Sequence, residues 1–113
     1  FRFAQASEVA NHLDGISGPW IIAGDFNDEP RSRTLDLFQA RAREAVKPTD
    51  HAFTFPSREP VKEIDFIFVS PPYEWDVNTV RVVSDTMASD HLPVLAELER
   101  QSTQSQSAPS PAC

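Results

Sequence analysis

Residues 64–69, with the sequence Ile-Asp-Phe-Ile-Phe-Val, are the most strongly β-forming run of the chain and constrain its fold more than any other feature. Aromatic and β-branched residues favour strands, and proline at position 71 ends the run. Residues 20–23 form a shorter, continuously apolar run, which predicts a strand covered on both faces. Alternating patterns predict two more strands, at residues 77–83 and 93–98.

Two helices are predicted in the first half of the chain. Ser32 is expected to cap a helix that runs to about Ala42. The element order is then helix, strand, helix and three strands, which indicates an α/β fold whose last strands pair antiparallel. The earlier helix, which Gly15 would end, is predicted from apolar residues at three- and four-residue spacings: Phe3, Ala4, Val9, Ala10 and Leu13.

Polar residues border or interrupt three of the predicted strands. Residues 24–27 (Gly-Asp-Phe-Asn) follow the first apolar run, Asp65 lies inside the strongest strand, and residues 89–94 (Ser-Asp-His-Leu-Pro-Val) lead into the last. Burying an unpaired charge is costly. Three such places in one short chain therefore predict a single shared polar site.

Asp25 and Asn27 are the first candidates for this site. Residues two apart in an extended segment project to the same side, so the carboxylate and the amide could converge on one ligand. The carboxylate could bind a hard cation or orient a water molecule, and the amide could donate to a phosphate oxygen. The alternative is an Asx-type turn after the strand, which the same residue types favour.

Asp65 and His91 are expected to contact each other. His is the side chain best suited to proton transfer near neutral pH, and a carboxylate on its far ring nitrogen would fix its tautomer. Asp65 is the candidate for that carboxylate. The alternatives are an edge carboxylate that caps the strand and a histidine with a structural role.

Taken in order, the three motifs resemble those of the endonuclease/exonuclease/phosphatase superfamily, over about residues 1–99. Residues 54–56 (Thr-Phe-Pro) also resemble a feature of that family. The resemblance implies the C-terminal half of a four-layered α/β sandwich with mixed, largely antiparallel sheets. It also implies metal-dependent hydrolysis of phosphate esters, of the phosphodiesterase, nuclease or phosphatase type.

The resemblance also assigns expected roles. Asp25 would position or activate the attacking water near the metal, and Asn27 would contact the scissile phosphate. Asp65 would orient His91, which would contact the phosphate and transfer protons. Asp90 would join Asp25 as a metal ligand. Oxygen and amide ligands favour Mg²⁺ or Mn²⁺ over zinc.

The family also uses an Asn and a Glu from strands that precede anything in this chain. We therefore expect residues 1–100 to be the C-terminal part of such a domain. Its partner would be the N-terminal half of the same domain, and the isolated chain is expected to have little activity. The alternative is an inactive, truncated scaffold that acts in binding or assembly. Residues 101–113, rich in Ser, Gln and Pro, are expected to be a disordered tail because they have almost nothing to bury.

Charge limits the expected substrates. The net charge is −7, with no run of basic residues, whereas nucleic-acid binding uses a basic face. A small phosphorylated molecule or a lipid headgroup is therefore mildly favoured over nucleic acid. The single cysteine, Cys113, excludes an intrachain disulfide and a Cys-based zinc site. No membrane-spanning run of about 18 apolar residues and no signal peptide is visible, so the location stays open.

Overall fold

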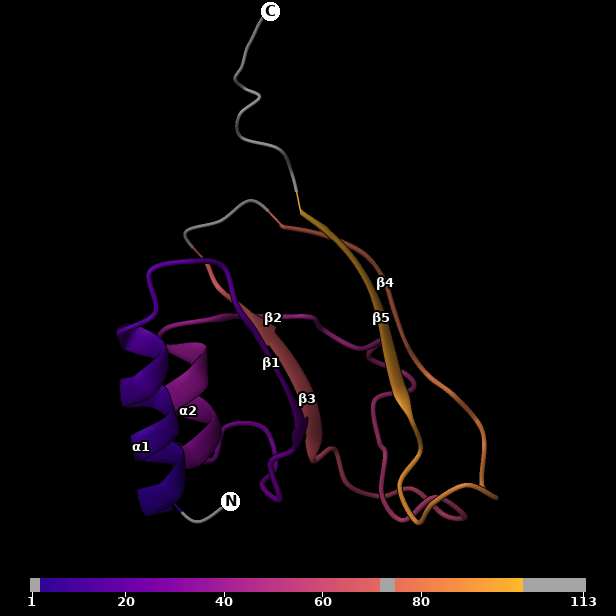
Figure 1. The fold of residues 1–113 in the computed structure, drawn as a ribbon. Helices are drawn as coiled ribbons and strands as arrows, with labels where there is room; N and C mark the ends of the chain where they lie inside the picture. Colours follow the sequence, from indigo (N-terminus) through magenta and orange to yellow (C-terminus); the bar gives the residue numbers. More distant parts are fainter. Residues whose placement is uncertain (1–2, 72–74, 101–113) are drawn as a thin grey trace, which may run out of the picture.

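Two antiparallel sheets and two helices make up the part of the chain that the structure describes, residues 3–71 and 75–100, in a computed structural model (Figure 1). The first sheet has the order β1-β3-β2, and β4 pairs with β5 in the second. In chain order the elements are α1 (Phe3–Asp14), β1 (Ile21–Asp25), α2 (Arg33–Gln39), β2 (Arg43–Glu44), β3 (Asp65–Val69), β4 (Trp75–Val82) and β5 (Val94–Arg100).

β3 is the central strand of the first sheet. Its partner β1 runs antiparallel to it, from the pair Ile21–Val69 to the pair Asp25–Asp65. The short β2 pairs with the other side of β3. Figure 1 shows α1 and α2 on one side of this sheet and the long β4–β5 ribbon on the other. The end of β1 and the start of β3 therefore lie together at one end of the sheet.

Both predicted helices are present. α1 buries Ala6, Ala10 and Leu13. The Oγ of Ser32 accepts a hydrogen bond from the backbone N–H of Leu35 at 3.2 Å, which confirms the predicted cap. α2 ends at Gln39 rather than near Ala42, because the chain turns there into β2.

Aromatic rings form the core between the helices and the first sheet. The ring of Phe26 meets that of Phe38 edge to face, with centroids 5.0 Å apart, and that of Phe66 at 5.7 Å. Phe26 is fully buried, and its backbone N–H donates to the carbonyl of Ile64 at 2.8 Å. The core thus anchors the segment that follows Asp25.

The prediction that the first strand is covered on both faces is wrong. β1 lies at the edge of its sheet, and Ile21 is 49% exposed. Four of the five β1 residues are exposed. Its apolar side chains are more exposed than the composition of the run suggested, because the described part of the chain packs little over them.

The α/β class with antiparallel sheets is confirmed, and all pairings among the described strands are antiparallel. The four-layered sandwich and the boundary at residue 100 remain predictions, and residues 101–113 lie outside the described part of the chain. Within residues 3–71 and 75–100, no helix has the length and apolar character needed to cross a bilayer.

Candidate active site

Two carboxylates face each other where β1 ends and β3 begins. Asp25 and Asp65 are direct cross-strand partners, and their side chains are 46% and 16% exposed. Like charges in such a pair destabilise a sheet. A compensating group is therefore required at this end of the sheet.

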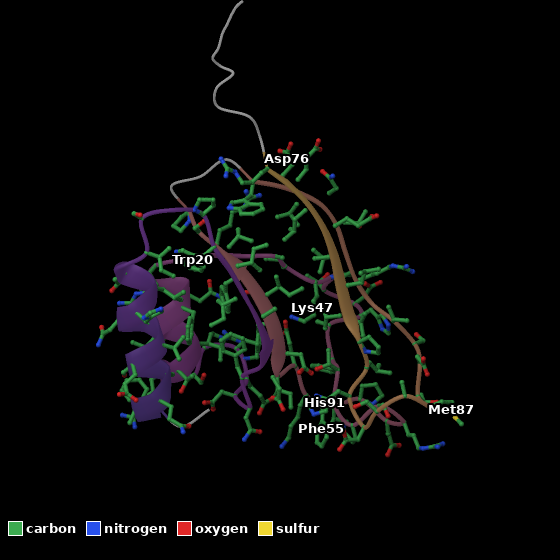
Figure 2. The ribbon with its side chains drawn as sticks, viewed as in Figure 1. Trp20, Lys47, Phe55, Asp76, Met87 and His91 are labelled. Carbon is green, nitrogen blue, oxygen red and sulfur yellow. The ribbon has the colours of Figure 1, made fainter. Side chains whose placement is uncertain are left out.

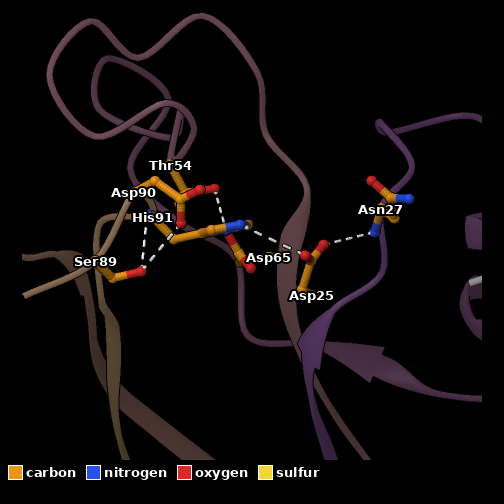
Figure 3. A network of polar contacts seen from close by, with 7 residues as sticks. All are labelled: Asp25, Asn27, Thr54, Asp65, Ser89, Asp90 and His91. Atoms are coloured by element: carbon orange, nitrogen blue, oxygen red, sulfur yellow. Dashed lines mark hydrogen bonds and ion pairs between the residues drawn. The ribbon is translucent and has the colours of Figure 1, made fainter.

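His91 supplies that group, as Figure 3 shows. Its Nδ1 lies 2.8 Å from Oδ2 of Asp65, and its Nε2 lies 3.5 Å from Oδ2 of Asp25. The next residue, Leu92, donates its backbone N–H to the carbonyl of Thr54 at 2.7 Å. The ring of Phe55 packs against the imidazole at a centroid distance of 4.8 Å. The contact expected between Asp65 and His91 is thus present, with the imidazole held from several sides.

Thr54 is a further member of the network, and sequence reasoning gave it no role. It is fully buried, and its Oγ1 donates to Oδ2 of Asp65 at 2.6 Å. The same oxygen of Asp65 is the one that Nδ1 of His91 contacts. The available signal was its place in the Thr-Phe-Pro motif of residues 54–56.

The pKa of His91 is raised above its ordinary value. The hydrogen bond to Asp65 is the largest cause, partial burial opposes it, and the negative charges of Asp65, Asp25 and Asp90 add to it. The imidazolium form therefore persists to higher pH than in a free histidine. A group of this kind can donate a proton near neutral pH.

Asn27 lies on the other side of Asp25, as Figure 3 shows. Its backbone has a left-handed φ of 55°, and its N–H donates to Oδ1 of Asp25 at 2.8 Å, as in an Asx turn. The strand alternation behind the expectation that the two side chains project to the same side does not extend to Asn27, because β1 ends at Asp25 and the chain turns there. Asn27 lines a separate hollow of about 120 Å³ with Phe55 and Lys62.

Asp90 is close to this network without joining its centre. Its carboxylate is 3.4 Å from the Oγ of Ser89, and its carbonyl accepts from the N–H of Ser57 at 2.7 Å. The side chain is exposed, and its charge contributes to the raised pKa of His91. It does not line the cleft that contains Asp25 and Asp65.

The cleft has a volume of about 390 Å³ and combines one polar end with apolar walls. Among the described residues, ligand atoms of Asp25, Asp65 and His91 lie within 4.8 Å of one another. Asp65 is already bonded to Thr54 and His91, which leaves Asp25 as the accessible carboxylate. A carboxylate of this kind suits a hard divalent cation. The apolar walls come from both sheets and the segment before β5: Ala23, Ile67, Leu92, Pro93 and Val94.

The model of the Endonuclease/Exonuclease/phosphatase family matches residues 1–91. The chain is 26% identical to the endonuclease/exonuclease/phosphatase from Bacteroides vulgatus, with a TM-score of 0.71. A functionally unknown conserved protein from Enterococcus faecalis V583, 24% identical with a TM-score of 0.72, shares the fold. Each match covers 88% of this chain but 44% of the other, so the chain spans less than half of either structure. No curated protein sequence matches it.

Proposed function

Because this chain belongs to the endonuclease/exonuclease/phosphatase family, we propose that it supplies part of a site for metal-dependent hydrolysis of phosphate esters. The observation that carries the proposal is the imidazole of His91 between two carboxylates, 2.8 Å from Asp65 and 3.5 Å from Asp25. An oriented histidine beside an accessible carboxylate provides a proton donor and a group that can orient water.

His91 acts in this proposal as the acid that protonates the leaving oxygen. Asp65 holds Nδ1 and thereby directs Nε2 toward the cleft, as a carboxylate does in other catalytic dyads. Thr54 fixes the Asp65 carboxylate in turn. Asp65 and Thr54 thus position the imidazole, while His91 contacts the phosphate.

Asp25 acts on the other partner in the reaction, the attacking water. Its Oδ1 is held by the N–H of Asn27 and its Oδ2 faces His91. We assign Asn27 to the scissile phosphate through its side-chain amide, on the far side of Asp25 from His91. The substrate would then lie across Asp25, between the amide and the imidazole.

Asp25 would hold the divalent ion, Mg²⁺ or Mn²⁺, from within the cleft, and Asp90, which does not line the cleft, would be a second ligand from outside it. Both are exposed, and neither accepts a hydrogen bond from Thr54 or from the buried core. When bound, such an ion supplies positive charge that offsets the phosphate and the leaving oxygen.

We further propose that the rest of the site comes from the N-terminal half of the same domain, completing a four-layered sandwich. The support is the coverage of less than half of the similar structures. The net charge of −7 favours a small phosphorylated molecule or a lipid headgroup as substrate over nucleic acid. The same short coverage motivates the alternative, an inactive scaffold.

The test measures hydrolysis of bis(p-nitrophenyl) phosphate with Mg²⁺ by a protein that joins this chain to an N-terminal half of the family. His91→Asn should lower turnover by about a hundredfold or more, the usual contribution of a positioned acid. His12→Asn is the matched control, because His12 is exposed on α1. Full activity of His91→Asn would contradict the proposal, and no hydrolysis by the unchanged protein would favour the scaffold.

A further inference from the structure

A second hollow adjoins the cleft, on the other side of Ser89. It has a volume of about 330 Å³, and its walls are residues 56–58 and residues 86–90. Ser89 lines both this hollow and the cleft of His91. The N–H of Ser57 donates to the carbonyl of Asp90 at 2.7 Å and ties the two walls together. The cleft and the hollow are therefore neighbours that share Ser89.

Arg58 gives this hollow its chemical character. It is the one lysine or arginine among the residues that line the cleft and the hollow. It is exposed, and none of the ion pairs within residues 3–71 and 75–100 includes it. Asp90 is the one acidic residue that lines the hollow with it. A guanidinium that faces such a hollow without an ion-pair partner is suited to bidentate binding of a phosphate.

Met87 adds an apolar surface to the same hollow. Its side chain is 83% exposed, and its N–H donates to Oδ1 of Asp85 at 2.9 Å. Figure 2 shows Met87 at the same end of the molecule as His91 and Phe55. A flexible thioether can adapt to the carbon skeleton of a bound molecule. The hollow thus combines the cation of Arg58 with an exposed, flexible apolar side chain.

We propose that the Arg58 hollow binds a second phosphate group of a small substrate whose first phosphate ester lies against His91. The inference rests on the proposed function and narrows its substrate class to small molecules with two phosphate groups. A polymer backbone is disfavoured, because neutralising successive phosphates takes a row of cations, and Arg58 stands alone here.

The test compares two ligands that share a carbon skeleton, propyl phosphate and propanediol bisphosphate, both with Mg²⁺. Binding to the chain is followed by proton–nitrogen correlation spectra. The bisphosphate should bind about fivefold more tightly, the effect of one exposed charge-assisted contact. It should shift the amides of Arg58 and Met87. Arg58→Gln should remove the difference between the ligands. Arg81→Gln is the matched control, because Arg81 is exposed on β4 and lines neither cavity.

Equal affinity for the two ligands, or a difference that survives Arg58→Gln, would overturn the proposal. Arg58 would then only offset the charge of Asp90. Tetrathymidylate, a short single-stranded DNA, is the third ligand tested. If Arg58 raised the affinity for tetrathymidylate but not for the bisphosphate, the small-molecule assignment would also be overturned. The amides of Asp25 and His91 report the cleft separately. If they stay unshifted while the Arg58-dependent gain remains, the proposed function fails and the subsite stands.

Discussion

Asp25 and Asp65 are directly opposite each other in the β1–β3 pair, and the imidazole of His91 contacts both carboxylates. The sheet thus brings two negative charges together at one end, and a residue from the segment before β5 compensates them. The two ring nitrogens face different carboxylates: Nδ1 faces Asp65, and Nε2 faces Asp25. Asp65 is held by Thr54 as well, whereas Asp25 is nearly half exposed.

Replacing Asp65 with Asn should lower the pKa of His91 toward its ordinary value, because the Asp65 hydrogen bond is the largest cause of the rise. A titration of the His91 ring protons by nuclear magnetic resonance would measure this change. Asp36→Asn, an exposed position on α2, should leave the titration unchanged. An unaltered His91 pKa in Asp65→Asn would show that this contact does not form in solution.

The stability of the fold should depend on pH through His91. Since its pKa is higher in the folded chain than in the unfolded one, the contribution is fully present below about pH 6.5, the ordinary histidine value. It is lost as pH rises through the folded pKa. Melting temperatures of the unchanged chain and of His91→Gln, measured without metal, should therefore converge as the pH rises. A gap that widened with pH would contradict the raised pKa.

Thr54→Val should destabilise the fold by about 1–2 kcal/mol, the cost of removing one partner from a buried polar group. Thr54 is fully buried, and its hydroxyl bonds to Asp65. Thr54→Ser retains the hydroxyl and should recover most of the loss. Urea denaturation of the three proteins would decide, and a Thr54→Val protein as stable as the unchanged chain would show that the hydroxyl bond to Asp65 contributes nothing.

Gly24→Ala should destabilise the chain by about 1–3 kcal/mol through backbone strain. Gly24 has a φ of 153°, which L-residues rarely adopt, while the space around its missing Cβ is open. Gly18→Ala is the control, since Gly18 has equally open space and no such φ. Chemical denaturation should separate the two variants, and identical curves would argue against strain at position 24.

The 113-residue chain should bind Mg²⁺ only weakly, with a dissociation constant of about 1 mM or more. Mg²⁺ demands octahedral geometry and gives up water reluctantly, so a partial ligand set holds it poorly. Asp25→Asn should weaken binding further. Calorimetric titration would measure both, and micromolar affinity in the unchanged chain would show that its ligand set is complete.

The contact between Asp65 and His91 could be predicted because the chemistry of the two side chains requires a partner for each. The exposure of β1 could not, because it depends on what packs over the faces of the strand rather than on its own apolar residues. The position of Asn27 depended on a left-handed turn that strand alternation does not describe. The burial of Lys47 could not be predicted from the sequence either. Its ammonium is buried 2.9 Å from Glu63 and lies over the ring of Phe66, contacts that only the folded chain creates.

The pairing of β1 with β3 also has a consequence for the integrity of the site. Side chains alternate between the faces of a strand, so a slip of β1 by one residue would turn Asp25 away from His91. An edge strand with few buried residues has little of its own to prevent this. Phe26, the next residue after Asp25, fixes the register of β1 against β3. Its ring is fully buried, and its backbone N–H donates to the carbonyl of Ile64. The aromatic core therefore fixes the register of β1 and with it the position of Asp25 relative to His91. A substitution in the core that shifted this register would abolish the activity of the site in a protein that still folds.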